Sequence, residues 1–197
     1  MATASVSGPS GLDRLTRLSS INISQKGRGF KGNKYTVYSQ DEVLFSLKED
    51  GHALTFLTSG SKRGLHIDGV DNTGRTVFHL RRPGVFVSDK VELHMDKSLV
   101  CIVRKENTFM TPVFSINDAR DTPVLRIKGD ITDYDFKIQG KNKQRIGGIK
   151  KQFGGLLKEM FSRNDDYVIT FPADLDVRFK LAVIAACVLI DYRYHES

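Results

Sequence analysis

The sequence predicts a mainly β protein with one central α-helix: a closed antiparallel barrel of about twelve strands around a buried, hydrophobic C-terminal helix. Short β-prone segments separated by turn residues follow one another between residues 21 and 171. The ten residues Leu181–Ile190 then carry no polar side chain. Charged residues confine that run at both ends, with Lys180 before it and Asp191 after it.

The chain begins its predicted structure with leucines at positions 12, 15 and 18, a short amphipathic turn or helix. Strands are then expected over residues 21–23, 34–38, 43–47, 54–57, 64–68, 76–80, 91–95, 99–104, 113–116, 124–127, 134–138, 145–151, 155–161 and 167–171. Most of them form hairpins, including a last pair of residues 155–161 with residues 167–171. A sheet of this length is expected to close, because closure removes its edges, and its wide lumen then needs a filler.

The C-terminal apolar run is a candidate for that filler, with a membrane anchor as the alternative. A transmembrane helix needs roughly 20 apolar residues, and runs of about 10–14 are typical of buried helices. We therefore expect a core helix over residues 177–191, with Asp174 or Asp176 near its start as a cap. The side chains expected in the core are those of Leu181, Ile184, Cys187 and Val188.

Composition sets the class of protein and its partners. The 197 residues fit a single domain, expected over residues 11–197 after a disordered tail of residues 1–10. The net charge of +7 favours anionic partners such as acidic membranes, nucleic acid or acidic proteins. Two cysteines, Cys101 and Cys187, lie in apolar segments and are expected to be reduced, buried and unreactive. No secretion signal is recognisable, so we expect an intracellular protein.

The C-terminal region resembles a known family. The segment Asp165-Asp-Tyr-Val-Ile-Thr-Phe-Pro-Ala-Asp-Leu-Asp-Val-Arg-Phe-Lys180, together with Ala185–Tyr192, is similar to the C-terminal signature of the phospholipid scramblases. Shorter similar elements occur at Gly11–Leu15, Asn33–Tyr35, Arg81–Pro83 and Gly148–Phe161. The resemblance implies the tubby-like fold, a twelve-stranded barrel around a hydrophobic C-terminal helix. It also implies calcium-dependent binding or movement of phospholipids at membranes and, in some members, nuclear import and DNA binding.

The calcium-binding segment of that family corresponds here to residues 163–174, in which Asp165, Asp166 and Asp174 are the candidate ligands. A calcium ion needs six to eight oxygens, and EF-hand spacing needs an acidic first, a glycine sixth and a glutamate twelfth position. This segment has Arg, Val and Asp there. The alternative interpretation is a turn, a strand and a helix cap, so we expect any Ca²⁺ bound here to be held with low affinity.

A basic segment, residues 137–151, carries six cationic side chains and no acidic one. Cations near an anionic membrane contribute about 1 kcal/mol each to its binding. The alternative is a solvated hairpin face without a ligand. The candidate contacts for anionic lipid or phosphate are Lys137, Lys141, Lys143, Arg145, Lys150 and Lys151.

Two functions follow as hypotheses. The first is a scramblase-family protein that binds acidic phospholipids or moves them across the bilayer in response to calcium. The second is a soluble tubby-like module that binds phosphoinositide, DNA or protein through its basic face, without transport. No enzymatic motif is recognisable, and the five histidines show no metal-ligand spacing along the sequence. The expected location is the cytosolic face of a membrane, with the nucleus as a second destination.

Overall fold

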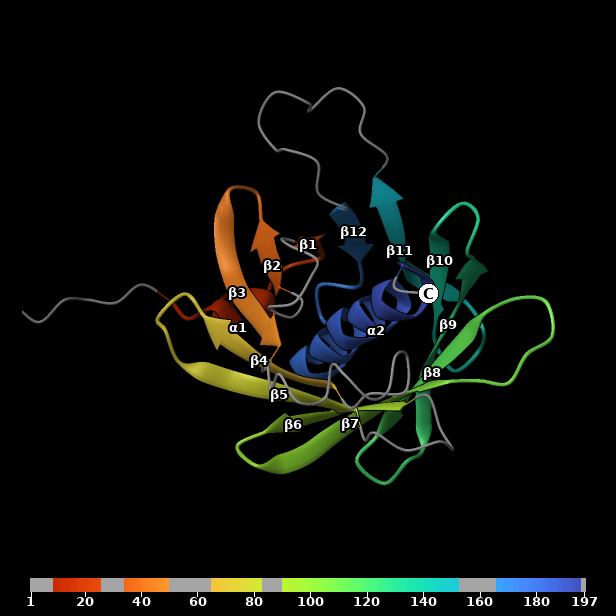
Figure 1. Cartoon of the computed structure of the whole chain (residues 1–197), viewed down its shortest axis with the longest axis horizontal. Helices are drawn as coiled ribbons and strands as arrows, with labels where there is room; N and C mark the ends of the chain where they lie inside the picture. Colours follow the sequence, from red (N-terminus) through yellow and green to blue (C-terminus); the bar gives the residue numbers. More distant parts are fainter. Residues whose placement is uncertain (1–8, 26–33, 50–64, 83–89, 153–165, 196–197) are drawn as a thin grey trace, which may run out of the picture.

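The protein forms a closed, twelve-stranded antiparallel barrel with its C-terminal helix inside (Figure 1). The computed structural model describes residues 9–25, 34–49, 65–82, 90–152 and 166–195. Each strand pairs with its neighbours in sequence, and β1 closes the barrel by pairing with both β2 and β12. The elements are α1 (Gly11–Leu15), β1 (Ser20–Gln25), β2 (Lys34–Ser39), β3 (Glu42–Glu49), β4 (Leu65–Asp71), β5 (Thr76–Arg82), β6 (Lys90–Met95), β7 (Ser98–Lys105), β8 (Val113–Asp118), β9 (Pro123–Asp130), β10 (Asp135–Gln139), β11 (Arg145–Gln152), β12 (Asp166–Thr170) and α2 (Val177–His195).

Aspartates start three of the hairpin turns. Asp71, Asp118 and Asp130 each end a strand and accept a hydrogen bond from the backbone N–H two residues further on, at 2.8–2.9 Å. Such side chains stabilise turns locally, because they replace a backbone acceptor. The turns predicted from aspartate, asparagine and glycine therefore lie between consecutive strands, and sequential antiparallel pairing follows.

The core is the space between the strands and α2. Residues Leu181–Ile190 are all at most 1 % exposed, so the helix is enclosed on every side. The prediction of a buried helix is confirmed, including its four expected core residues Leu181, Ile184, Cys187 and Val188. Within the described residues, no helix has both the length and the apolar character that crossing a membrane requires.

Aromatic side chains from the strands pack in the same core. Phe45 and Phe78 meet edge to face with ring centroids 5.5 Å apart, and Phe114 and Phe136 do so at 6.3 Å. Each such ring, fully buried, contributes roughly 1.5–3 kcal/mol through its removal from water. Strands on different sides of the barrel thus enclose the helix with large apolar side chains.

The last predicted hairpin is wrong. Both edges of β12 are occupied, one by β1 and the other by β11, so residues 167–171 cannot pair with residues 155–161. Closure on β1 uses one edge of β12, and β11 takes the edge that the predicted hairpin needed, so the barrel closes with twelve strands. The segments 54–57 and 155–161, expected as strands, lie outside the described residues, as do residues 1–8 of the expected tail.

The N-terminal end of α2 is held by a buried lysine. Asp176 caps the helix, since its Oδ1 accepts a hydrogen bond of 2.9 Å from the Arg178 N–H. Lys180, fully buried, donates through Nζ to four backbone carbonyls at 2.7–3.1 Å. These carbonyls belong to Leu15, Thr16, Leu18 and Ala173. The lysine therefore joins α2 to the segment that follows α1.

The other end of α2 is held by a buried carboxylate. Asp191 is 1 % exposed and accepts a hydrogen bond of 2.9 Å from each of two tyrosine hydroxyls, those of Tyr35 and Tyr167. The two tyrosines come from β2 and β12, on either side of β1. The strands on both sides of the closing strand are thus attached to the helix.

Candidate functional site

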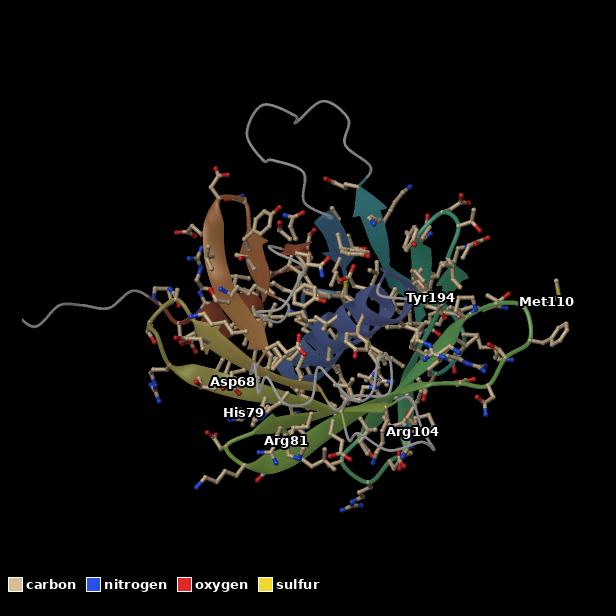
Figure 2. All side chains as sticks on the ribbon, viewed as in Figure 1. Asp68, His79, Arg81, Arg104, Met110 and Tyr194 are labelled. Carbon is tan, nitrogen blue, oxygen red and sulfur yellow. The ribbon has the colours of Figure 1, made fainter. Side chains whose placement is uncertain are left out.

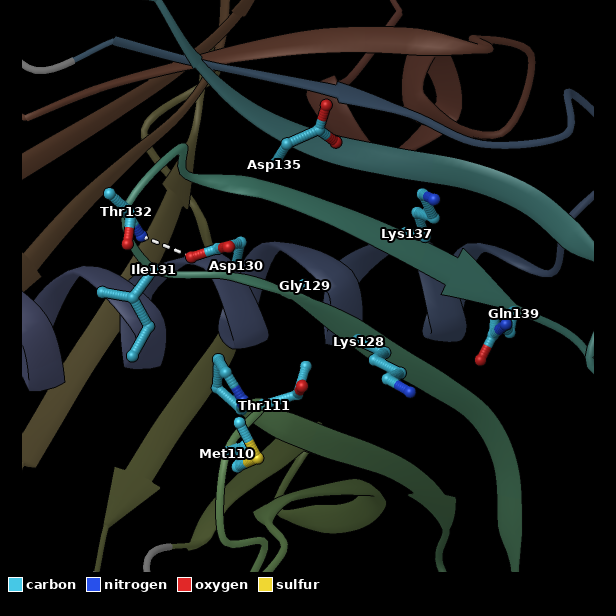
Figure 3. A pocket seen from close by; sticks show the side chains of 11 residues that line it. Met110, Thr111, Lys128, Gly129, Asp130, Ile131, Thr132, Asp135, Lys137 and Gln139 are labelled. Carbon is cyan, nitrogen blue, oxygen red and sulfur yellow. Dashed lines mark hydrogen bonds between the residues drawn. The ribbon is translucent and has the colours of Figure 1, made fainter.

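A hollow of about 640 Å³ lies on the outside of the barrel, over β9 and β10 and beside the loop between β7 and β8 (Figure 3). Its strand residues include two lysines, Lys128 and Lys137, and two aspartates, Asp130 and Asp135. A cavity of several hundred Å³ has the size of a small-ligand site. We call it the β9–β10 hollow.

Strand register places like charges opposite each other in this hollow. Lys128 is the direct partner of Lys137, and Asp130 is the direct partner of Asp135. Direct pairs have Cβ atoms about 4.5–5.5 Å apart, and like charges in such pairs are destabilising. Since alternate residues of a strand share a face, both pairs lie on the outer surface, separated along the strands by about 6.6 Å.

The lysine pair has no counter-ion in the part of the chain that the structure describes. Among the described residues, neither Lys128 nor Lys137 forms an ion pair or a hydrogen bond with a side chain. The aspartates are engaged in part: Asp130 accepts from the Thr132 N–H at 2.8 Å, and Asp135 lies 3.8 Å from Lys150 Nζ. Two adjacent ammonium groups without a protein partner form a place where an anion would be stabilised.

The loop beside the hollow presents apolar side chains to solvent. Phe109 is fully exposed and Met110 is 89 % exposed (Figure 2). The base of this loop is closed by a 2.8 Å hydrogen bond from the Glu106 N–H to the Val113 carbonyl, and Thr108 donates to the Thr111 carbonyl at 2.5 Å. Contiguous exposed apolar groups are typical of surfaces that bind proteins or membranes. Met110 also lines the β9–β10 hollow, so the apolar tip and the lysine pair adjoin.

The predicted basic segment is divided by the strand geometry. Lys137 lies in the hollow, and Lys141, Lys143 and Arg145 are exposed at the turn between β10 and β11. Gln139 joins the two regions, because it lines the hollow and its Nε2 donates to the Lys143 carbonyl at 3.1 Å. Four of the six predicted cations therefore form one continuous outer surface.

The two lysines at the end of the segment point in opposite directions. Lys150 is exposed near Asp135, whereas Lys151 is only 6 % exposed. The Nζ atom of Lys151 lies 4.8 Å from the Tyr134 ring centroid and 5.8 Å from that of Tyr167. Consecutive residues of a strand face opposite sides, so the pair could not share the outer surface. Lys151 is accordingly removed from the predicted lipid-contact set.

The candidate calcium ligands are spread along the chain. Asp165 lies outside the described residues, and Asp166 begins β12, without a described side chain. Asp174 is exposed in the turn that precedes α2. Burial lowers the pKa of Lys180, and the negative charge of the Asp174 carboxylate partly offsets this by raising it. The weak calcium site at Asp165, Asp166 and Asp174 stays a prediction, because two of its three carboxylates lie outside the described side chains.

Several residues of the surface were not predicted from sequence. Asp135 lies in the expected strand 134–138, whereas Lys128 and Asp130 lie beyond the end of the expected strand 124–127, because β9 continues to Asp130. Phe109 and Met110 lie in a stretch that was expected to be a connection, where exposed apolar residues are not distinguishable from buried ones. The pairing register of β9 with β10, and not the residue composition, was therefore the signal that could have identified the charged residues of the hollow.

Fold and surface together define a class: a closed twelve-stranded barrel around a helix, whose outer face offers paired cations beside an exposed apolar loop. The model of the family described as Scramblase matches residues 1–197. The chain belongs to this family, and this membership supports a phospholipid scramblase function. The family consists of lipid-binding or transport proteins rather than catalysts.

Individual relatives agree with this assignment. Phospholipid scramblase 2 of Bos taurus is 31 % identical over 211 residues, 95 % of this chain and 72 % of the relative. Phospholipid scramblase 1 of Homo sapiens is 30 % identical over 212 residues, 96 % of this chain and 67 % of the relative. An Arabidopsis thaliana protein of known X-ray structure shares the fold, with a TM-score of 0.52 at 16 % identity over 87 % of this chain and 88 % of that one.

Proposed function

We propose that this protein binds acidic phospholipids at the cytosolic face of a membrane and promotes their movement between the two leaflets. The observation that carries the proposal is the facing pair Lys128 and Lys137, which has no counter-ion among the described residues, beside the exposed Phe109 and Met110. A phospholipid has the matching chemistry, because it combines an anionic head group with apolar chains. The names of the relatives support the same class of ligand.

The lipid head group lies in the β9–β10 hollow in this proposal. The phosphate takes the place between Lys128 and Lys137, and a head-group amine takes the place between Asp130 and Asp135. The two pairs are about 6.6 Å apart along the strands, the scale of a phosphoserine or phosphoethanolamine group. Among acidic lipids, the arrangement therefore favours phosphatidylserine over one without an amine.

The loop tip supplies the apolar part of the binding. Insertion of Phe109 and Met110 contributes roughly 3–6 kcal/mol at about 1.5–3 kcal/mol for each side chain. The two lysines add roughly 2 kcal/mol at about 1 kcal/mol each near an anionic surface. The sum of roughly 5–8 kcal/mol corresponds to a Kd between about one and a few hundred micromolar.

Co-sedimentation with vesicles tests the binding. Lys128→Gln combined with Lys137→Gln should weaken binding to phosphatidylserine vesicles about thirtyfold, the equivalent of about 2 kcal/mol. A matched control is Lys34→Gln with Lys97→Asn, which removes the same charge from exposed positions outside the hollow. If both double variants lost vesicle binding equally, the change in net charge would explain the loss, and the proposed site would be overturned.

Two further variants test the parts of the site. Phe109→Ser with Met110→Ser should weaken binding to all vesicles, because the apolar insertion is lost. Asp130→Asn with Asp135→Asn should leave phosphatidylglycerol binding intact and reduce the preference for phosphatidylserine. An unchanged preference would contradict the assignment of the amine to the aspartate pair.

A second candidate function is binding without transport, to phosphoinositide, DNA or protein. The filled barrel favours it, because α2 occupies the interior and leaves the lipid no route through the lumen. Reduction of fluorescent lipid in vesicles by dithionite, with and without Ca²⁺, separates the two functions. Loss of inner-leaflet fluorescence above a protein-free control supports transport, and its dependence on Ca²⁺ would support the calcium response that the family resemblance implies.

A further inference from the structure

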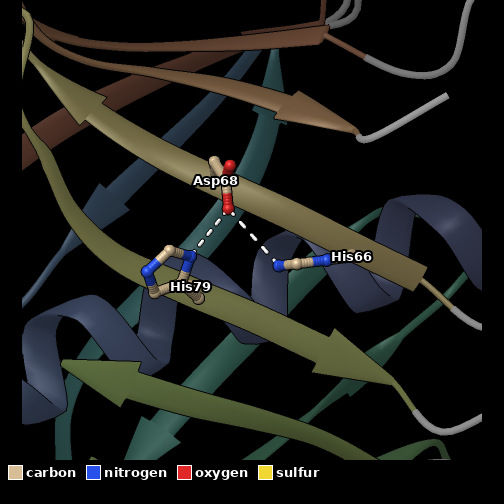
Figure 4. A group of neighbouring side chains, drawn as sticks. All are labelled: His66, Asp68 and His79. Carbon is tan, nitrogen blue, oxygen red and sulfur yellow. Dashed lines mark hydrogen bonds and ion pairs between the residues drawn. The ribbon is translucent and has the colours of Figure 1, made fainter. Parts of the chain in front are cut away.

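Three side chains with metal-binding chemistry meet on the outer face of the β4–β5 hairpin (Figure 4). His66 and Asp68 are two residues apart on β4, so they share a face, and Asp68 is the direct partner of His79 on β5. Each of the three side chains is partly buried, with between 33 and 41 % of its surface exposed. We call this group the β4–β5 triad.

The triad is close to the geometry of a bound metal. His79 Nδ1 lies 2.7 Å from Asp68 Oδ1, His66 Nε2 lies 3.4 Å from the same oxygen, and all candidate ligand atoms are within 4.8 Å of one another. Ligands of a tetrahedral zinc ion, each about 2.0–2.2 Å from the metal, lie about 3.3 Å apart. Small rotations of three partly exposed side chains cover the difference.

One atom of the triad lacks a satisfactory partner. His66 Nε2 is inaccessible to solvent and, among the described residues, forms no hydrogen bond. It lies 3.4 Å from Asp68 Oδ1, close enough for an ion pair but without a hydrogen bond. Buried polar atoms are nearly always paired, and a bound ion is one of the explanations for an exception.

We propose that the β4–β5 triad binds a transition-metal ion of the Zn²⁺ class through His66 Nε2, the Asp68 carboxylate and His79 Nδ1. Two imidazoles and one carboxylate suit zinc, whereas calcium takes six to eight oxygens, so this site is distinct from the calcium site that the resemblance implies. Coordination uses the lone pair of His79 Nδ1, so the His79 ring carries its proton on Nε2 when the metal is bound. The fourth position is left to water.

The site is independent of the proposed lipid function. The triad lies on β4 and β5, and the hollow lies over β9 and β10, about half-way round the twelve-strand order. A metal across the β4–β5 hairpin joins two neighbouring strands, so the ion should stabilise the fold by mass action. The buried thiols of Cys101 and Cys187 offer no competing soft ligand at the surface.

Calorimetric titration of the full chain with ZnCl₂ tests the proposal. We expect one Zn²⁺ per triad, a rise in Tm with Zn²⁺ and none with Ca²⁺. His66→Asn and His79→Asn should each weaken that binding tenfold or more. The matched control is His94→Asn, since His94 is the direct partner of His79 on β6 but lies outside the triad, and it should bind as the wild type does.

Nitrogen NMR of the histidines gives a readout that does not depend on folding of variants. Zinc should shift the Nε2 resonance of His66 and the Nδ1 resonance of His79, the two nitrogens that face Asp68. Absence of stoichiometric binding to the wild type would overturn the proposal. So would unchanged binding in both triad variants, or a loss confined to His94→Asn.

Discussion

Replacement of Lys180 by methionine should destabilise the fold strongly. The lysine is fully buried and donates to the carbonyls of Leu15, Thr16, Leu18 and Ala173. Its Nζ also lies 5.2 Å from the centroid of the Phe171 ring. The ammonium is shielded from water and bonds to carbonyls instead, and this burial lowers the pKa of Lys180.

The magnitude follows from the hydrogen bonds. An ammonium group has three protons, and each hydrogen bond to a charged group contributes about 1.5–3 kcal/mol. Methionine fills the space of the stem, so little cavity energy is added. The ammonium no longer has to be desolvated, which offsets part of the loss, while carbonyls left without a donor cost about 1–3 kcal/mol each. We expect a net loss of about 3–5 kcal/mol.

Urea unfolding followed by circular dichroism measures this loss. For a chain of this size, about 3–5 kcal/mol corresponds to a fall in Tm of roughly 6–20 °C. Lys34→Met is the matched control, because Lys34 is exposed at the start of β2, and surface substitutions usually change stability by less than about 0.5 kcal/mol. A loss below about 1 kcal/mol in Lys180→Met would refute the view that this lysine attaches the α1 segment to the helix.

Two other predictions concern the buried core. Ala186→Arg should abolish soluble expression of folded protein, because it places an unpaired charge at a position with no exposed surface; a normal yield and Tm would contradict the buried helix. Burial raises the pKa of Cys101 to about 12 and that of Cys187 well above its ordinary value, so neither should react with a thiol reagent at pH 8 until urea unfolds the chain. Because the folded pKa values are raised, the free energy of unfolding should fall as the pH rises above about 9, and Cys101→Ala with Cys187→Ala should reduce that slope.

Much of the fold could be predicted from local patterns. The apolar run from Leu181 to Ile190 and the alternating strands each follow from one segment of the chain, and turn residues such as Asp71 identify the connections. The pairing of β12 with β11 could not be obtained in this way, because the local signal favours a hairpin with the nearer segment, residues 155–161. The other edge of β12 pairs with β1, as closure of the barrel requires.

The candidate site was harder to predict than the core. The charge of the basic segment indicated an anion-binding face, and Lys137 belongs to it. The partner Lys128 precedes that segment in sequence and becomes its neighbour only through the β9–β10 register. The β4–β5 triad was missed for the same reason, since His66 and His79 are thirteen residues apart and meet only across the hairpin.

Several of the residues by which this chain resembles the scramblases stabilise the fold. Asp176 caps α2, Lys180 holds the α1 segment, and Tyr167 bonds to Asp191 inside the barrel. A signature of this kind identifies the fold, because each member contacts another part of the same core. Contacts with lipid need side chains that remain accessible, such as those of the β9–β10 hollow. Since α2 fills the lumen, a lipid that crosses the bilayer with the help of this protein must travel along the outer surface, where Lys128, Lys137 and the exposed loop tip lie together.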